Sequence, residues 1–174
     1  MFTFKTEGTV AKGARHKVPW KLMLAGAFVA CAFGGIAVGI AWATPGSGVT
    51  PTLLAGPVPL DEIHIVSQSP THGVQIKTRG QWTCRAIHYS IVPGGHTGWH
   101  SHPGPVFVMI TAGTMTKYEA TDLNNPAYYP AGTGFVEAGG DVHIAGNEGT
   151  SDLKFVAFHL VPLGEPVRID EPAP

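Results

Sequence analysis

Hydrophobic positions follow two different patterns along the 174-residue chain. Residues 22–43 form one apolar stretch without a charged side chain, whereas beyond residue 60 the apolar residues come in short runs between glycine- and proline-containing turns. Such short runs predict β-strands, and no segment beyond residue 43 has the periodicity of a helix. The predicted strands cover residues 62–67, 81–92, 106–111, 114–119, 134–137, 142–145 and 153–161. We therefore expect an all-β domain of the double-sheet barrel type.

The long apolar stretch predicts a segment that crosses or enters a membrane. As a helix, residues 22–43 would extend about 33 Å, which is enough for a hydrocarbon core of about 30 Å. Basic residues precede the stretch and none follows until Lys77, so the N-terminus is expected in the cytoplasm and the barrel outside it. A signal peptide cleaved after Ala43 is the alternative, although the apolar region is longer than signal peptides need.

Proline-rich segments flank the expected barrel on both sides. Four prolines between residues 44 and 60 indicate an extended linker, and the prolines after residue 161 indicate a frayed or arm-like C-terminal end. The expected organisation is a basic cytoplasmic N-terminus at 1–21, an anchor or signal at 22–43, a linker at 44–60, a barrel at 61–162 and a tail at 163–174.

Composition and charge narrow the functional classes. With 23 glycines, 15 prolines and 13% charged residues, the chain suits short strands and many turns. Residues 44–174 carry 6 basic and 11 acidic side chains, which makes this part a poor match for nucleic acid. Cys31 and Cys84 are expected on opposite sides of a membrane boundary, so no disulfide between them is predicted. We interpret Cys84 as a small buried hydrophobe, with a bond between subunits or a nucleophilic role as alternatives.

Histidines gather in one short stretch, residues 94–105, which contains His96, His100 and His102. On a strand, positions i and i+2 lie on one face, so the imidazoles of His100 and His102 could bind one metal ion together. His143, on a short apolar strand after a glycine turn, is the candidate for a third ligand.

These stretches resemble the two sequence motifs of the cupin family over roughly residues 60–162. The first motif is met by Gly94 or Gly95, His100, His102 and Gly113, and the second by Pro130, Gly132, His143 and Asn147. The resemblance implies a cupin-like jelly-roll β-barrel in which inward-facing residues of several strands surround one cavity.

The resemblance also implies a metal site, with one departure from the family pattern. The usual glutamate ligand falls on Val106, next to Phe107, and neither side chain can bind a metal. By resemblance, the protein ligands are His100, His102 and His143. Glu137 is a candidate fourth ligand, or alternatively a partner that fixes the tautomer of a histidine.

Further pocket candidates come from the predicted strands and the motifs. In strand 81–92, the face with His88 is polar enough to line a cavity, whereas the face with Tyr89 is mixed. His159 shares its parity with apolar neighbours in the closing strand and could face the interior. The candidates are His88, Tyr89, His96, Asn147 and His159.

We therefore expect an exported or membrane-anchored cupin-domain protein that binds a divalent metal, Fe, Mn, Ni or Zn, through three histidines. One hypothesis is a metal-dependent oxidoreductase of the dioxygenase kind. The alternative is a non-catalytic envelope module that binds a small ligand or a metal, and a third interpretation is a barrel without metal. Expected partners are a small molecule, the membrane through residues 22–43, and a second copy in a homodimer.

Overall fold

The computed structural model describes residues 43–174, and the expected basic segment and the rest of the membrane segment lie outside the described residues. Within 43–174 the chain contains no helix of the length and apolarity that a membrane span requires. The strands are β1 (Ser47–Leu60), β2 (His64–Gln68), β3 (Gly73–Lys77), β4 (Trp82–His96), β5 (His100–Ser101), β6 (Val106–Ala112), β7 (Thr114–Glu119), β8 (Asp122–Pro130), β9 (Gly134–Glu137), β10 (His143–Gly146), β11 (Leu153–Pro162) and β12 (Ile169–Asp170). The prediction of an all-β domain is confirmed.

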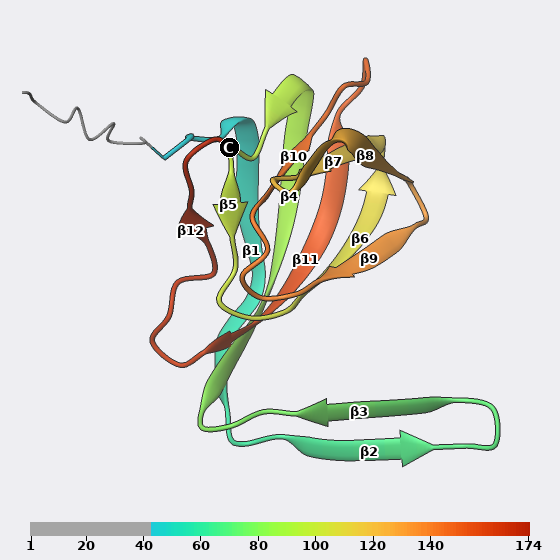
Figure 1. The fold of residues 1–174 in the computed structure, drawn as a ribbon, viewed down its shortest axis with the longest axis vertical. Coiled ribbons are helices and arrows are strands. Elements are labelled where there is room, and N and C mark those ends of the chain that lie inside the picture. The colour runs from blue at the N-terminus through green and yellow to red at the C-terminus, as the bar shows by residue number, and fades with distance from the viewer. Residues whose placement is uncertain (1–42) are drawn as a thin grey trace, which may run out of the picture. The chain divides into compact units, whose positions relative to one another are not determined.

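Ten of these strands form one sheet that curls into a nearly closed barrel (Figure 1). The order along the sheet is β12-β5-β10-β4-β11-β6-β9, with β1 paired to β4, and with β7 joining β10 to β8. β4 and β11 pair over ten residues, from Leu153 opposite Ile91 to Pro162 opposite Trp82. β2 and β3 form a separate two-stranded sheet.

The barrel interior is built by alternation along the strands. In β6, Val106, Val108 and Ile110 are buried whereas Phe107 and Met109 are exposed, as expected for a strand with one face towards a core. The same alternation in β11 buries Leu153, Phe155, Ala157 and His159. The core therefore fills one end of the interior with aliphatic side chains, and His159 enters the same interior as a polar residue.

The prediction of a linker at residues 44–60 is wrong, because Ser47–Leu60 is strand β1, which pairs with β4. β1 pairs with no other strand, and prolines are tolerated on such an edge because one row of its backbone groups has no partner. Asp122–Pro130 is a second edge strand, β8, which pairs with β7 alone and includes Pro126.

The C-terminal segment is not frayed. Its strand β12 pairs with β5, with Ile169 opposite Ser101 and Asp170 opposite His100. Ser101 also donates a hydrogen bond from Oγ to Glu171 Oε1 at 2.8 Å. We call residues 163–174 the C-terminal arm, and this arm lies directly beside the histidine stretch. Cys84, on β4, is half-buried and is not in a disulfide within the described residues.

Candidate metal centre

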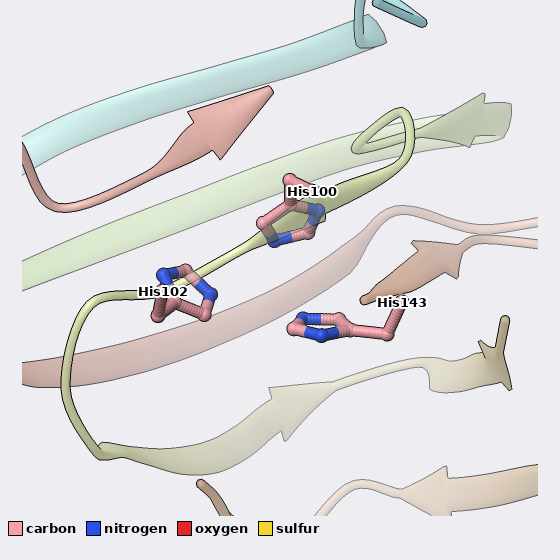
Figure 2. A group of neighbouring side chains, drawn as sticks. All are labelled: His100, His102 and His143. Atoms are coloured by element: carbon pink, nitrogen blue, oxygen red, sulfur yellow. The ribbon is translucent and has the colours of Figure 1, made fainter. Parts of the chain in front are cut away.

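Three histidines meet inside the barrel because of one strand pairing. His100 begins β5 and His143 begins β10, and the two residues are direct partners in the antiparallel β5–β10 pair. Directly opposed residues project to the same side of a sheet, and His102 follows His100 at i+2. The ring centroids lie 4.3 Å apart for His100 and His143, 4.9 Å for His100 and His102, and 5.4 Å for His102 and His143. Figure 2 shows the three rings turned towards a common space, and all three residues are buried.

Each histidine is held by its Nδ1 atom against a backbone carbonyl. The acceptors are Gly98 O at 2.9 Å for His100, Val167 O at 2.5 Å for His102 and Asp141 O at 2.9 Å for His143. A carbonyl can only accept, so the proton of a neutral ring must be on Nδ1, and Nε2 carries the lone pair. The three potential ligand atoms lie within 4.8 Å of one another. This is the arrangement in which protein histidines bind metals.

Glu137 completes the cluster from strand β9, at the end of the sheet opposite to β5. Its Oε1 lies 3.0 Å from His143 Nε2, and its Oε2 lies 3.3 Å from His102 Nε2. Glu137 is the direct cross-strand partner of Val106, the position at which the cupin pattern has its glutamate. The carboxylate therefore reaches the cluster from the strand beside the one that the family pattern uses.

The contacts of Glu137 with the two histidines need a cation between them. With both Nδ1 protons given to carbonyls, the lone pairs of His102 and His143 Nε2 face the lone pairs of carboxylate oxygens. Such a contact is repulsive unless a proton or a metal ion lies between the atoms. Imidazole nitrogen and carboxylate oxygen are ligands that divalent transition metals take, and His102, His143 and Glu137 would hold such an ion between them. The spacing and the donor set therefore fit a divalent transition metal.

A buried lysine supports the position of the carboxylate. Lys117 Nζ lies 3.9 Å from Glu137 Oε1, forms an ion pair with Glu119, and sits 5.6 Å from the centre of the Phe135 ring. The sequence analysis missed Lys117 because a lysine in a short strand usually points to solvent, whereas this residue is buried. Its charge offsets part of the cost of burying Glu137.

The electrostatic environment keeps the site in the protonation state that a metal requires. Burial, together with repulsion from His143, lowers the pKa of His100 to about 2, so that this ring is neutral at physiological pH. Burial alone would raise the pKa of the Glu137 carboxyl. Hydrogen bonds that the carboxylate accepts when a proton lies between it and His102 and His143 outweigh burial and hold that pKa well below its usual range. Glu137 is therefore ionised.

A cavity of about 520 Å³ opens beside the cluster, and His100, His102, His143 and Glu137 all line it. Of the pocket candidates from the sequence, Tyr89 and His159 also line this cavity. Much of the remaining wall is apolar, including Val106, Val108, Met115 and Phe155. The cavity therefore has one polar wall, at the histidines, which suits a small ligand that is oriented by few polar contacts.

Three other pocket candidates lie elsewhere. His88 is on the opposite face of β4 from Tyr89, so the predicted assignment of the two faces is reversed. His96 and Asn147 line a separate small pocket of about 250 Å³. Asn147 is structural: its amide donates to Ile91 O and Ser151 O, both at 2.8 Å, and its Oδ1 accepts from Gly149 N.

The C-terminal arm contributes to the site, which sequence reasoning missed. Val167 provides the carbonyl that orients His102, and Arg168 and Asp170 line the cavity. A main-chain carbonyl leaves no mark in a sequence, so the role of Val167 had no signal. The charged residues Arg168 and Asp170, in an otherwise proline-rich tail, were the only available indication.

Stability of the metal-free protein is expected to fall as the pH is lowered from 7 to 5. Burial, followed by repulsion from His102, lowers the pKa of His159 to about 4, and the pKa of His100 is lower still. In the unfolded chain both groups take up protons near pH 6.5, whereas in the folded protein they stay neutral. Their contribution to the free energy of unfolding is therefore full above pH 6.5 and falls as the pH drops below it. At pH 5 each contributes a loss of about 2 kcal/mol.

Urea unfolding of full-length protein with a chelator at pH 7, 6 and 5 measures this dependence. In His159→Phe, the change in the free energy of unfolding between pH 7 and 5 should be smaller by the contribution of one histidine. In His64→Gln, at an exposed position, this change should equal that of the wild type. A free energy of unfolding that does not change between pH 7 and 5 would contradict the burial of neutral histidines.

Comparison with known proteins gives matches among solved structures. Neither a family model nor a curated protein matches the chain. A conserved protein with a double-stranded β-helix domain from Klebsiella pneumoniae subsp. pneumoniae MGH 78578 aligns at 17% identity and a TM-score of 0.44, covering 64% of this chain and 80% of that one. The cupin domain of an XRE family transcriptional regulator from Enterobacter cloacae aligns at 12% identity and a TM-score of 0.43, covering 66% of this chain and 97% of that one.

An oxalate oxidase in complex with the substrate analogue glycolate aligns at 19% identity and a TM-score of 0.43, covering 50% of this chain and 45% of that one. At these identities and TM-scores the likeness says nothing about activity. The solved structures similar to this chain include cupin and double-stranded β-helix proteins, the family that its two histidine motifs predict.

Proposed function

We propose that this chain is a metal-binding cupin in which His100, His102, His143 and Glu137 hold one divalent transition metal inside the barrel. The observation that carries the proposal is the orientation of the imidazoles. Their Nδ1 atoms are committed to backbone carbonyls, and two of their Nε2 atoms face the Glu137 carboxylate at 3.0 and 3.3 Å. Those contacts become favourable when a metal ion, or a proton, lies between the atoms, and the three imidazoles with the carboxylate are a donor set that suits a metal.

The proposed activity is that of a metal-dependent oxidoreductase of the dioxygenase kind. Three imidazoles and one carboxylate leave positions on an iron or manganese ion at which a small ligand or dioxygen can bind. The cavity of about 520 Å³ supplies room for a small organic substrate beside the histidines. The chain's own contribution would be to orient that substrate, to exclude bulk water with apolar walls and to keep Glu137 ionised.

Location and assembly are also proposals. We propose that residues 22–43 anchor the protein or direct its export, so that the barrel functions outside the cytoplasm. The support is the uncharged apolar stretch with basic residues before it. A homodimer stays a prediction.

Metal analysis tests the proposed function. Full-length protein, freed of metal with a chelator and offered equal amounts of Fe(II), Mn(II), Ni(II) and Zn(II), should retain one equivalent of metal per chain after desalting. At a free metal concentration of 100 times the Kd, the bound ion should stabilise the fold by about 2.7 kcal/mol. Less than a tenth of an equivalent, with no change in thermal unfolding, would refute the metal centre.

Oxygen consumption then separates the two functional classes. Protein loaded with Fe(II) or Mn(II) is tested in an oxygen electrode against a panel of small organic acids and phenols, with His143→Ala as the matched control. Turnover that His143→Ala abolishes supports the oxidoreductase. One bound metal without turnover supports the non-catalytic binding module instead.

A further inference from the structure

The buried polar atoms without a hydrogen-bond partner are concentrated in one place. Among residues 43–174 they are Thr83 Oγ1, Arg85 Nε, and both ring nitrogens of His159. Thr83 and Arg85 lie on β4, and His159 lies on β11, directly opposite Arg85. Thr83 is opposite Val161, two residues further along the same pair of strands. The three side chains therefore form one row on the inner face of the sheet.

Leaving these groups unpaired is costly for the fold. A buried donor or acceptor without a partner destabilises the fold, and Arg85, although half-buried as a residue, has its Nε fully covered. Arg85 forms no ion pair with any of the described residues. The nearest acidic group of the site, Glu137, is already engaged by His102, His143 and Lys117. A cluster of polar atoms, mostly donors, that no residue of 43–174 satisfies indicates a ligand that accepts hydrogen bonds.

The position of the row connects it to the cavity. His159 is 2% exposed, lines the cavity, and has its ring centroid 5.4 Å from that of His102. The ring of Tyr89, which also lines the cavity, lies 6.4 Å from the ring of His159. An occupant held at His159 would therefore lie next to the histidine cluster.

Charge decides the kind of occupant. A guanidinium has only donors, arranged as a fork that matches the two oxygens of a carboxylate, and hydroxyl and imidazole N–H groups donate as well. Arg168, the other arginine near the cavity, is already hydrogen-bonded through Nε to Asp170 Oδ1 at 2.5 Å. Arg85 is therefore the cation that is available for an anionic ligand.

We propose that Arg85, His159 and Thr83 form a carboxylate-binding subsite behind His159, the one of the three that lines the cavity, and that this subsite takes small carboxylate anions. The four unpaired atoms are covered in the absence of a ligand, so the anion gains access when the ring of His159 rotates. The subsite is separate from the metal ligands and does not need the metal. With a metal bound, a carboxylate compound held there would present its other end to the histidine cluster.

Acetate and acetamide, which have nearly the same shape, test the subsite in full-length protein kept metal-free with a chelator. Binding is measured by ligand-observed NMR and by the shift of the thermal unfolding temperature. Acetate should bind at least about tenfold more tightly than acetamide, and Arg85→Gln should remove at least tenfold of that affinity. His159→Phe should weaken acetate binding severalfold, whereas Arg79→Gln, at an exposed position, should change it by less than threefold.

A second measurement covers the case in which Arg85→Gln fails to fold. Without ligand, Arg85→Met should raise the unfolding temperature by about 2–4 °C, since it removes a covered Nε that has no partner among residues 43–174. Acetate should stabilise the wild type but not this variant. Equal binding of acetate and acetamide, unchanged acetate binding in Arg85→Gln, or a large loss of stability in Arg85→Met would each overturn the proposal. Because the protein is metal-free, a failed metal centre leaves these results unaffected.

Discussion

Replacing Glu137 by glutamine is expected to weaken metal binding by about 100-fold, which corresponds to about 2.7 kcal/mol. The change keeps the size of the side chain but removes the negative charge that faces His102 and His143 at 3.3 and 3.0 Å. Competition with a chromophoric chelator measures the affinity. Glu119→Gln is the matched control, since Glu119 also contacts Lys117 and, although it is opposite His143 in the β7–β10 pair, forms no ion pair with a described histidine. Equal affinities for Glu137→Gln and the wild type would exclude Glu137 as a ligand.

Exchange of Val106 and Glu137 tests whether a carboxylate on β6 can replace the one on β9 as a metal ligand. Val106 and Glu137 are opposed across the β6–β9 pair, and the Cβ atoms of such partners lie about 5 Å apart. Both side chains are buried in the interior. Val106→Glu combined with Glu137→Val should therefore recover at least tenfold of the affinity that Glu137→Val alone loses. If the double variant binds no better than Glu137→Val, the carboxylate works only from β9.

The convergence of the histidines could be predicted because two signals agreed. Periodicity placed His100 and His102 on one face, and the ordered motifs brought in His143 from a later strand. The structure adds the reason, which is the direct pairing of His100 with His143. Strand pairing is a long-range property, so the alternation of residues within one strand cannot reveal it.

Prolines and side-chain polarity gave wrong predictions for the edge strand β1 and for the inward face of β4. The prolines of β1 indicated a linker, but an edge strand tolerates them because its unpaired side needs no donors. In β4, the face with His88 was predicted to line the cavity because it is the more polar face. The cavity is instead lined by Ile87 and Tyr89, so the inward face is the more apolar one. Arg85 has the same parity as Ile87 and Tyr89, and its Nε is buried although the residue as a whole is half-buried.

Removal of residues 167–174, most of the C-terminal arm, is expected to lower metal affinity by about 10- to 100-fold, because outer partners of metal ligands commonly contribute that much. Without Val167 O, which lies 2.5 Å from His102 Nδ1, nothing fixes the tautomer or the direction of that ring. The pairing of β12 with β5 and the hydrogen bond from Glu171 N to Trp99 O at 3.0 Å would also be lost, so β5 would lose one of its two partners.

The matched control is removal of residues 173–174 alone, which leaves β12 and Glu171 in place. Ser101→Ala breaks one side-chain contact of the arm, the hydrogen bond to Glu171 Oε1, and should cost little metal affinity, since the Val167 carbonyl stays where it is. Chelator competition on the full-length protein, both truncations and Ser101→Ala gives the comparison. If the protein without 167–174 kept wild-type affinity, β5 alone would orient His102, and the arm would be only a cover of the cavity.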